Sequence, residues 1–334
     1  MLRVAVVGVG SMGRNHVRVY RDMAEVQLVA VADQFYEAAQ SVGQLYQIPT
    51  YTDYFEMVER ERPDAVSVVV PTQEHFRVAQ ILLEMGCHVL VEKPIARTLD
   101  EAKKLIDIAH LNEKILMVGH IERYNPAIIE LKRRLDTGEL GRVFHIHTRR
   151  LGPMPTRIHD VGVTMDLATH DLDIMRYVTG SEVLRVYAEA RREVHPYHED
   201  MLDGMVRFAN GTVGLLEISW LTPTKIREIC VTGERGMFRA DYVTQDLYFY
   251  ENHAANGADW ASLSIFRGVK EGAMTRFAIH KKEPLRAELE AFIHHILHRN
   301  SPLANGYDGQ MALRLALALI ESAQNGSVQP VNIM

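Results

Sequence analysis

Short apolar runs alternate with helix-like segments over the first 120 residues of the chain. A continuous apolar run is typical of a strand that is covered on both faces of its sheet. The segments between the runs, such as FRVAQILLEMG and LDEAKKLIDIAH, repeat apolar residues at helical spacing. This alternation predicts βαβ units, and hence an α/β Rossmann dinucleotide-binding domain with a parallel sheet over residues 1–120. The apolar runs are LRVAVVG (2–8), VQLVAVAD (26–33), AVSVVVP (65–71), CHVLVEKP (87–94) and ILMVGH (115–120).

The pattern changes after residue 120, where strand-like segments follow one another without long helices between most of them. Such a series predicts a largely antiparallel sheet, and Asn210-Gly211 between two strands is a hairpin signal. We therefore expect residues 121–334 to form an α+β domain with a large open, mainly antiparallel sheet. One helix is predicted over 120–141 and two more over roughly 284–299 and 307–324, which can pack back on the first domain. The strand segments are 142–151, 183–193, 200–220, 228–242 and 246–251.

An open sheet of this kind needs a cover on its far face, which predicts a homodimer or homotetramer. Composition narrows the class of protein further: 47% of the 334 residues are hydrophobic, 24% are charged, and the formal net charge is −6. A net negative chain argues against nucleic acid or an anionic membrane surface as the main partner. The two isolated cysteines, Cys87 and Cys230, and the lack of an apolar segment of roughly 20 residues favour a cytoplasmic protein.

The sequence GVGSMG stands between the first predicted strand and the first predicted helix. Gly8 allows a tight turn, Gly10 lets a pyrophosphate approach the backbone, and Gly13 lets the helix pack on the strand. Ser11 and Met12 complete this turn, and Asp33 closes the second strand twenty residues after Gly13. A carboxylate there can hold both ribose hydroxyls of NAD and repel the 2′-phosphate of NADP, so we expect NAD as the cofactor. The alternative is a glycine-rich turn without a ligand.

Three further segments end strands of the predicted parallel sheet, where ligands bind in open α/β folds. VEKPI (91–95) places Glu92 and Lys93 there, and Lys93 is expected to point toward the nicotinamide. An ordinary surface lysine in a strand-end turn is the alternative. The other two segments, PTQEH (71–75) and GHIERYNP (119–126), are candidates for contact with the cofactor. The residues concerned are Pro71, Thr72, His75, His120 and Arg123, and Tyr124 is a candidate for substrate binding.

The segment DLATHDLD (166–173) lies within a predicted apolar helix, and its polar residues fall on one face. Asp166, His170 and Asp173 are spaced by four and three residues. A polar face normally meets water, and this is the alternative to a substrate-facing stripe. Asp173 is assigned no chemistry, because pairing with Arg176 or with water accounts for it.

The segment RRLGPMPTRIHD (149–160) is predicted to be a loop before that helix. Its arginines, Arg149, Arg150 and Arg157, are suited to phosphate or carboxylate, although a solvated basic loop is the alternative. His159 lies in the same loop, close in sequence to His145 and His147. No cysteine joins these histidines and HPYHED (195–200) has no fixed ligand spacing, so we expect no metal.

GVGSMG, Asp33, VEKP and the D-x-x-x-H pair of Asp166 and His170 together resemble the Gfo/Idh/MocA oxidoreductases. The resemblance covers essentially the whole chain. GHIERYNP followed by RRLGPMPTRIHDVGVTMDLATHDLDIMRYV further resembles the family members that oxidise C3 of the sugar in UDP-N-acetylglucosamine. It implies an NAD-dependent dehydrogenase that acts on a UDP-sugar. The arginine loop would bind the diphosphate, and a 3-keto product would pass to an aminotransferase.

The resemblance also implies the roles of the central residues. His170 takes the hydroxyl proton, for which an imidazole is suited near neutral pH. Lys93 holds the hydroxyl and stabilises developing negative charge. Asp166 orients the sugar or the imidazole, and the hydride goes to the nicotinamide. Two alternatives stay open: the same chemistry on a free sugar or polyol such as inositol, and a dinucleotide-sensing regulator without activity.

Overall fold

The computed structural model describes residues 1–155, 161–253 and 270–331. The chain divides into two compact units. The first unit contains Met1–Tyr124 and Glu283–Leu313, and the second contains Asn125–Lys282 and Arg314–Met334.

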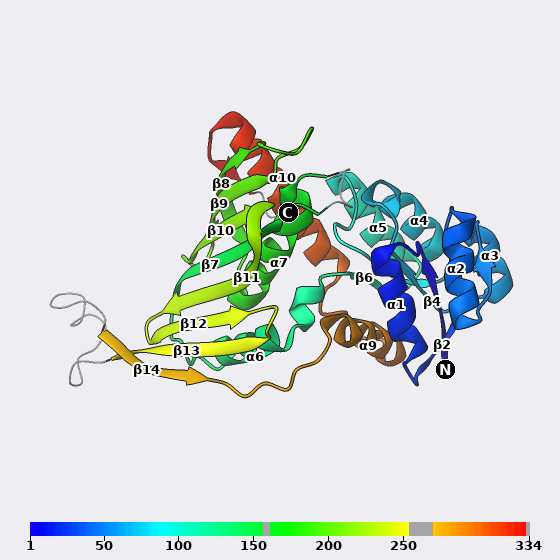
Figure 1. The fold of residues 1–334 in the computed structure, drawn as a ribbon, viewed down its shortest axis with the longest axis horizontal. Coiled ribbons are helices and arrows are strands. Elements are labelled where there is room, and N and C mark those ends of the chain that lie inside the picture. Colours follow the sequence, from blue (N-terminus) through cyan, green and yellow to red (C-terminus); the bar gives the residue numbers. More distant parts are fainter. Residues whose placement is uncertain (156–160, 254–269, 332–334) are drawn as a thin grey trace. The chain divides into compact units, whose positions relative to one another are not determined.

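The first unit is built on a six-stranded parallel sheet in the order β3-β2-β1-β4-β5-β6, with helices on both faces (Figure 1). The order turns back between β1 and β4, as in a doubly wound fold, and this confirms the predicted α/β Rossmann domain. The short strand β3 was not predicted. The strands are β1 (Leu2–Val7), β2 (Val26–Ala32), β3 (Thr50–Tyr51), β4 (Ala65–Val68), β5 (His88–Val91) and β6 (Leu116–Val118). The helices are α1 (Ser11–Arg21), α2 (Tyr36–Tyr46), α3 (Tyr54–Glu61), α4 (Thr72–Glu84) and α5 (Leu99–Leu111).

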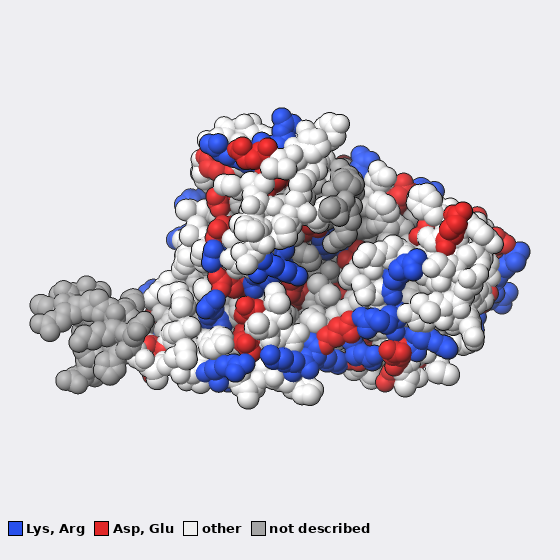
Figure 2. Space-filling view, viewed as in Figure 1, with Lys and Arg blue, Asp and Glu red and all other residues white. Residues whose placement is uncertain are grey.

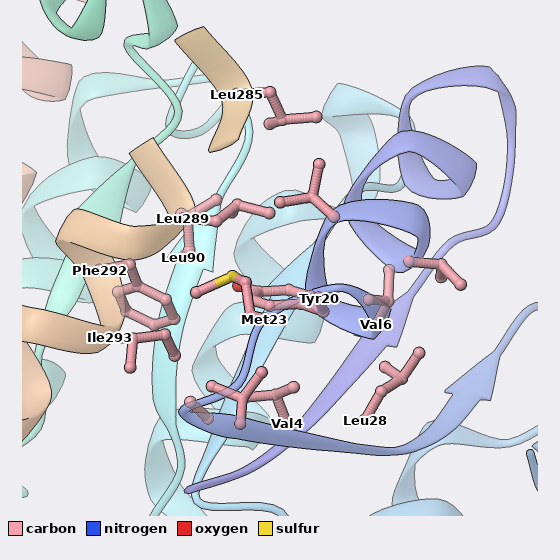
Figure 3. Close-up of a cluster of buried hydrophobic side chains, with 14 of the residues drawn as sticks. Val4, Val6, Tyr20, Met23, Leu28, Leu90, Leu285, Leu289, Phe292 and Ile293 are labelled. Carbon is pink, nitrogen blue, oxygen red and sulfur yellow. The ribbon is translucent and has the colours of Figure 1, made fainter. Parts of the chain in front are cut away.

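Helix α9 (Pro284–His298), far along the chain, belongs to this first unit. Its apolar face, which carries Leu289 and Phe292, packs beside Tyr20 of α1 in one buried cluster (Figure 3). Strands β1, β2 and β5 contribute Val4, Val6, Leu28 and Leu90 to the same cluster. Helix α10 (Gly306–Asn325) begins in the first unit and continues into the second, because the division falls after Leu313.

The second unit contains a nine-stranded sheet in the order β14-β13-β12-β11-β7-β10-β9-β8-β15. All its strand pairs are antiparallel except β7 with β10, which confirms the predicted mainly antiparallel sheet. The Asn210-Gly211 hairpin also forms, with Gly211 at φ 92° between β9 and β10. The strands are β7 (Val143–Pro153), β8 (Val183–Arg191), β9 (Met201–Phe208), β10 (Val213–Ser219), β11 (Leu221–Gly233), β12 (Gly236–Asp241), β13 (Asp246–His253), β14 (Lys270–Arg276) and β15 (Gln329–Pro330).

The single helix predicted over 120–141 is wrong, because a break at Asn125 divides it. A 3₁₀ turn, Ile121–Tyr124, precedes helix α6 (Pro126–Asp136). The side chain of Asn125 accepts a hydrogen bond from the amide of Ala127, and Pro126 occupies the first helical turn. These are start signals for a new helix. The two units meet in the sequence at this break.

Helices cover one face of the nine-stranded sheet, and the alternating burial along β7 shows which side chains point to that face. Ile146, Thr148 and Arg150 are buried, whereas the alternating residues His145 and His147 are half-exposed. Helix α7 (Thr169–Thr179) packs on β7, and α6 packs on β12 and β13. On the surface drawn in Figure 2, basic and acidic side chains are interspersed. In the described part of the chain, every helix is too short or too polar to cross a bilayer.

Candidate active site

The glycine turn between β1 and α1 is shaped by close backbone approach. A Cβ atom on Gly8 would lie 2.3 Å from the carbonyl oxygen of Val69, and one on Gly13 would lie 1.9 Å from that of Gly8. Gly8 also has φ 88°, which a side chain rarely tolerates. At Gly10 nothing lies within 4 Å of that position, and no side chain caps the helix that follows. The exposed helix start at Gly10 and Ser11 therefore fits a pyrophosphate.

Asp33, at the end of β2, is fixed beside this turn. Its two carboxylate oxygens accept hydrogen bonds from the amides of Val9 at 2.8 Å and Phe35 at 2.9 Å. The side chain is half-exposed, and each oxygen keeps a further lone pair for a hydroxyl donor. The position and charge of Asp33 thus fit the two ribose hydroxyls of a dinucleotide.

The turn that carries Lys93 follows β5 and is held from α4. The peptide bond between Lys93 and Pro94 is cis. The ring of His75 is buried, with Nδ1 2.7 Å from the carbonyl oxygen of Pro94 and Nε2 2.9 Å from that of Val70. Burial lowers the pKa of His75, although both carbonyls oppose this shift. His75 therefore links two strand-end turns through its ring, while Pro71 and Thr72 lie at the start of α4.

The residues after β6 are largely enclosed by the first unit. Arg123 is 4% exposed and contacts Asp308 of α10 and the carbonyl of Leu303, at 2.5 to 3.1 Å. Tyr124 is also 4% exposed, and its hydroxyl lies 3.9 Å from the sulfur of Met117. His120 is 2% exposed. The structure thus gives Arg123 and Tyr124 partners inside the unit, and their contacts with a cofactor or substrate stay predictions.

In the second unit, the segment that carries Asp166 and His170 is a π-helical turn, Thr164–Ala168, continued by α7. Asp166 and His170 are half-exposed, whereas Leu167, Ala168 and Thr169 between them are buried. Turns of this type are frequent at functional sites because they shift side chains from regular helical positions. The two polar residues are therefore the accessible groups of an otherwise buried stretch.

The predicted position of Asp173 on a solvated helix face is wrong. Asp173 is 1% exposed, because both faces of α7 are enclosed within the second unit. Arg176, which the sequence offered as its partner, forms hydrogen bonds with Glu182 at 2.5 and 2.8 Å, and its pairing with Asp173 stays a prediction. Asp173 is thus part of the interior that supports the helix.

Arg149 and Arg150 lie on strand β7, which confirms the strand predicted over 142–151 and corrects the start of the loop expected over 149–160. Arg150 points to the covered face, where its guanidinium pairs with Asp171 of α7 at 2.8 and 3.2 Å. Arg149 points to the opposite face and bonds Glu217 and Glu228, which lie directly beside it in β10 and β11. Both arginines therefore have carboxylate partners from their own unit. Arg157 and His159 lie outside the described residues.

Glu199 is a residue that the sequence did not single out. Its backbone carbonyl accepts from the amide of Val163 at 2.9 Å, and its carboxylate from that of Thr164 at 3.2 Å. A Cβ on Gly162 would lie 2.3 Å from this carboxylate. Glu199 thus fastens the start of the π-helical turn. The sequence signal for Glu199 was its place in the polar segment HPYHED. Among the described residues, no group of three His, Cys, Asp or Glu side chains could hold a metal ion.

The profile of the Gfo/Idh/MocA oxidoreductases, with an NAD-binding Rossmann fold, matches residues 2–120, and the C-terminal domain of that family matches 128–239. The chain is also 30% identical to UDP-N-acetylglucosamine 3-dehydrogenase of Acidithiobacillus ferrooxidans over 316 residues, 95% of each chain. The chain belongs to the Gfo/Idh/MocA oxidoreductase family. Its first unit is therefore an NAD-binding domain, as the glycine turn and Asp33 predicted.

Other similarities describe the range of this family. The scyllo-inositol 2-dehydrogenase of Bacillus subtilis is 28% identical over 97% of this chain and 95% of its own. A solved structure of the Acidithiobacillus ferrooxidans UDP-N-acetylglucosamine 3-dehydrogenase has a TM-score of 0.85 and 29% identity, covering 97% of this chain and 98% of the other. These relatives are thus named as dehydrogenases of sugars or polyols, and this chain belongs to the same family of NAD-binding oxidoreductases.

Proposed function

We propose that this chain oxidises the C3 hydroxyl of UDP-N-acetylglucosamine to the 3-keto nucleotide sugar with NAD. The observation that carries the proposal is the 30% identity to a UDP-N-acetylglucosamine 3-dehydrogenase over 95% of the chain. The half-exposed Lys93, Asp166 and His170 support it, because they supply the polar groups that alcohol oxidation needs.

We assign each of these residues a step. His170 removes the hydroxyl proton, since a neutral imidazole can accept it near pH 7. The ammonium of Lys93 stabilises the charge that develops on the oxygen. Asp166, at the π-helical turn, orients the sugar or the imidazole. Gly8, Gly10, Ser11, Met12, Gly13 and Asp33 hold NAD, which accepts the hydride when bound.

A second candidate is oxidation of a free polyol, and the 28% identity to an inositol dehydrogenase supports it. The two candidate substrates differ in the diphosphate, which a UDP-sugar carries and a free polyol lacks. Arg149 and Arg150 are engaged by carboxylates, so Arg157 is the remaining candidate among the three arginines of this segment. For the first candidate, we propose that the 3-keto product is consumed by an aminotransferase.

The test is a panel of substrates with the purified protein. NADH formation is followed with UDP-N-acetylglucosamine, UDP-glucose, free N-acetylglucosamine, myo-inositol and scyllo-inositol. We expect kcat/KM to be highest for UDP-N-acetylglucosamine, with a product whose mass is two units lower. A higher kcat/KM for an inositol would favour the polyol function, and NAD binding without turnover of any alcohol would contradict both.

A further inference from the structure

A buried histidine on the nucleotide-binding helix contacts the residue before Lys93. His16 of α1 is fully buried, and its Nε2 lies 3.1 Å from Oε1 of Glu92. The glycine turn leads into the same helix, which begins at Ser11, five residues before His16. The pair therefore joins the element that would hold the pyrophosphate of NAD to the turn that carries Lys93.

The other oxygen of Glu92 faces the Lys93 turn itself. Oε2 accepts a hydrogen bond from the amide of Lys93 at 3.3 Å. A Cβ on Gly119, at the end of β6, would lie 2.9 Å from the same oxygen, so Gly119 leaves the space that the carboxylate fills. Because β5 and β6 are neighbours in the sheet, Glu92 is enclosed on this side by backbone.

The charges around Glu92 favour its ionised form. Burial by itself would raise the pKa of Glu92, but the hydrogen bond and charge of His16 outweigh it, together with the charges of Lys93 and His75, and the pKa is lowered. An ionised carboxylate beside the Lys93 ammonium stabilises that charge. Glu92 thus accepts hydrogen bonds from His16 and from the Lys93 amide, and it carries its negative charge at the position next to Lys93.

Glu288 of α9, on which the charge of Glu92 acts, has its pKa shifted in the opposite direction. It is fully buried, and neither of its carboxyl oxygens has a hydrogen-bond partner among the described residues. Burial raises the pKa of Glu288 well above its ordinary value, and the charges of Glu92 and Glu122 add to this. When Glu288 is protonated and Glu92 is ionised, only Glu92 of the two carries a negative charge, next to Lys93.

We propose that His16 and Glu92 form a positioning pair, which holds the ammonium of Lys93 in place for the reaction through the carboxylate of Glu92. The inference deepens the proposed function and rests on it, because Lys93 is there the group that acts on the alcohol. The carboxylate of Glu92 is enclosed by His16, Gly119 and the Lys93 amide, and it acts through its neighbour.

The first test compares matched variants with NAD and the sugar substrate. Glu92→Gln keeps the shape and removes the charge, and we expect kcat to fall about 10- to 100-fold, with the Kd for NAD changed less than about twofold. His16→Leu should behave similarly. His16→Gln keeps an N–H donor and should restore most of the loss. Glu288→Gln makes the same chemical change at a buried acid that carries no charge, and its kcat should equal that of the unchanged protein.

The second test needs no turnover, so it separates this inference from the proposed function. Acetic anhydride labels neutral amines, and mass spectrometry can compare Lys93 with the exposed Lys103 and Lys104 in the same sample. When the carboxylate of Glu92 no longer holds the ammonium, labelling of Lys93 relative to Lys103 and Lys104 should rise in Glu92→Gln, and in Glu288→Gln it should not change. If both kcat and Lys93 labelling of Glu92→Gln match the unchanged protein, the pair has no positioning role. A lower thermal midpoint and weaker NAD binding with unaltered Lys93 labelling would show a purely structural role and also overturn the inference.

Discussion

At the scale of single residues, the catalytic assignment depends on two groups, and their removal tests it. Lys93→Met keeps the aliphatic chain and removes the charge, and His170→Ala removes the base. Each should lower kcat by about 10²–10⁴-fold, the usual range for a lost acid or base. Initial rates of NADH formation at saturating substrate measure the effect.

The double variant and NAD affinity serve as controls for this prediction. Two groups that stabilise one transition state act as a unit, so the double variant should be little slower than the worse single variant. NAD binding should persist in both single variants. Retention of more than about a tenth of the activity by His170→Ala would show that another group, with Asp166 the first to test, is the principal base.

Asp33 carries a second prediction at this scale, the choice between NAD and NADP. The unchanged protein should prefer NAD by a clear margin in kcat/KM, because the carboxylate repels a 2′-phosphate. Asp33→Ser should narrow this margin. Asp33→Asn is the matched control for geometry, since it keeps an oxygen for the amides of Val9 or Phe35. Equal use of both cofactors by the unchanged protein would contradict the assignment.

At the scale of elements, the ion pair between β7 and α7 determines how firmly the helix that carries His170 is held. Arg150 and Asp171 have side chains only 4% and 1% exposed, so removing one leaves a buried charge. Arg150→Ala should lower the free energy of unfolding by about 3–5 kcal/mol. Urea denaturation measures this.

Arg149→Ala is the matched control, one residue along the same strand. The side chain of Arg149 is 35% exposed, and its partner Glu228 also pairs with Arg239. Water and Arg239 can compensate, so the loss should be only about 0–1 kcal/mol. If both replacements lowered the free energy of unfolding equally, the ion pair on the covered face of the sheet would contribute no more stability than the one on the open face.

Helix α9 gives a prediction about pH, because it places Glu288 in the apolar interior of the first unit. The pKa of Glu288 is raised in the folded state, so above its ordinary value of about 4.3 folding requires uptake of a proton. The stability of the unchanged protein relative to Glu288→Gln is therefore greatest below that pH and falls as pH rises toward the folded pKa, by up to about 1.4 kcal/mol per pH unit. Urea midpoints of both proteins from pH 4 to 8 should show a growing advantage for the variant. A constant difference across this range would mean that Glu288 is ionised in the folded protein.

At the scale of the whole molecule, the uncovered face of the nine-stranded sheet suggests self-association. Met205, Leu215, His147 and Cys230 stand in one row across β9, β10, β7 and β11, and all are at least partly exposed. An accessible row with apolar members on a wide sheet face favours burial against a second copy of the chain.

We therefore expect a dimer or tetramer by light scattering at micromolar protein. Leu215→Glu places a charge in the middle of the row and should shift the mass toward the monomer. His110→Glu, on the helix α5 of the other unit, is a control that should leave the mass unchanged. A monomeric unchanged protein would contradict the expectation.

The sequence by itself determined both folds and the nucleotide turn. Continuous apolar runs favour a sheet covered on both faces, and strands in series without crossover helices favour a mainly antiparallel one. The turns at GVGSMG and at Asn210-Gly211 could also be predicted from local sequence, because each depends on the backbone of a few neighbouring residues. Residue type and spacing also singled out Asp166 and His170 as candidates, and their roles stay predictions.

Only the tertiary structure decided the partners of the charged groups, because a partner distant in the chain leaves no local pattern. Arg149 and Arg150 looked like one basic loop, but strand pairing sends them to opposite faces and to different carboxylates. Packing also encloses Tyr124, which no local pattern indicated, and its contact with a substrate stays a prediction. Glu92 faces His16 across 76 positions of sequence. Burial raises the pKa of Glu288, whereas at Glu92 the hydrogen bond and charge of His16 outweigh burial and the pKa is lowered. Residue type gives the chemistry that is available, whereas desolvation and long-range pairing decide which group retains its charge.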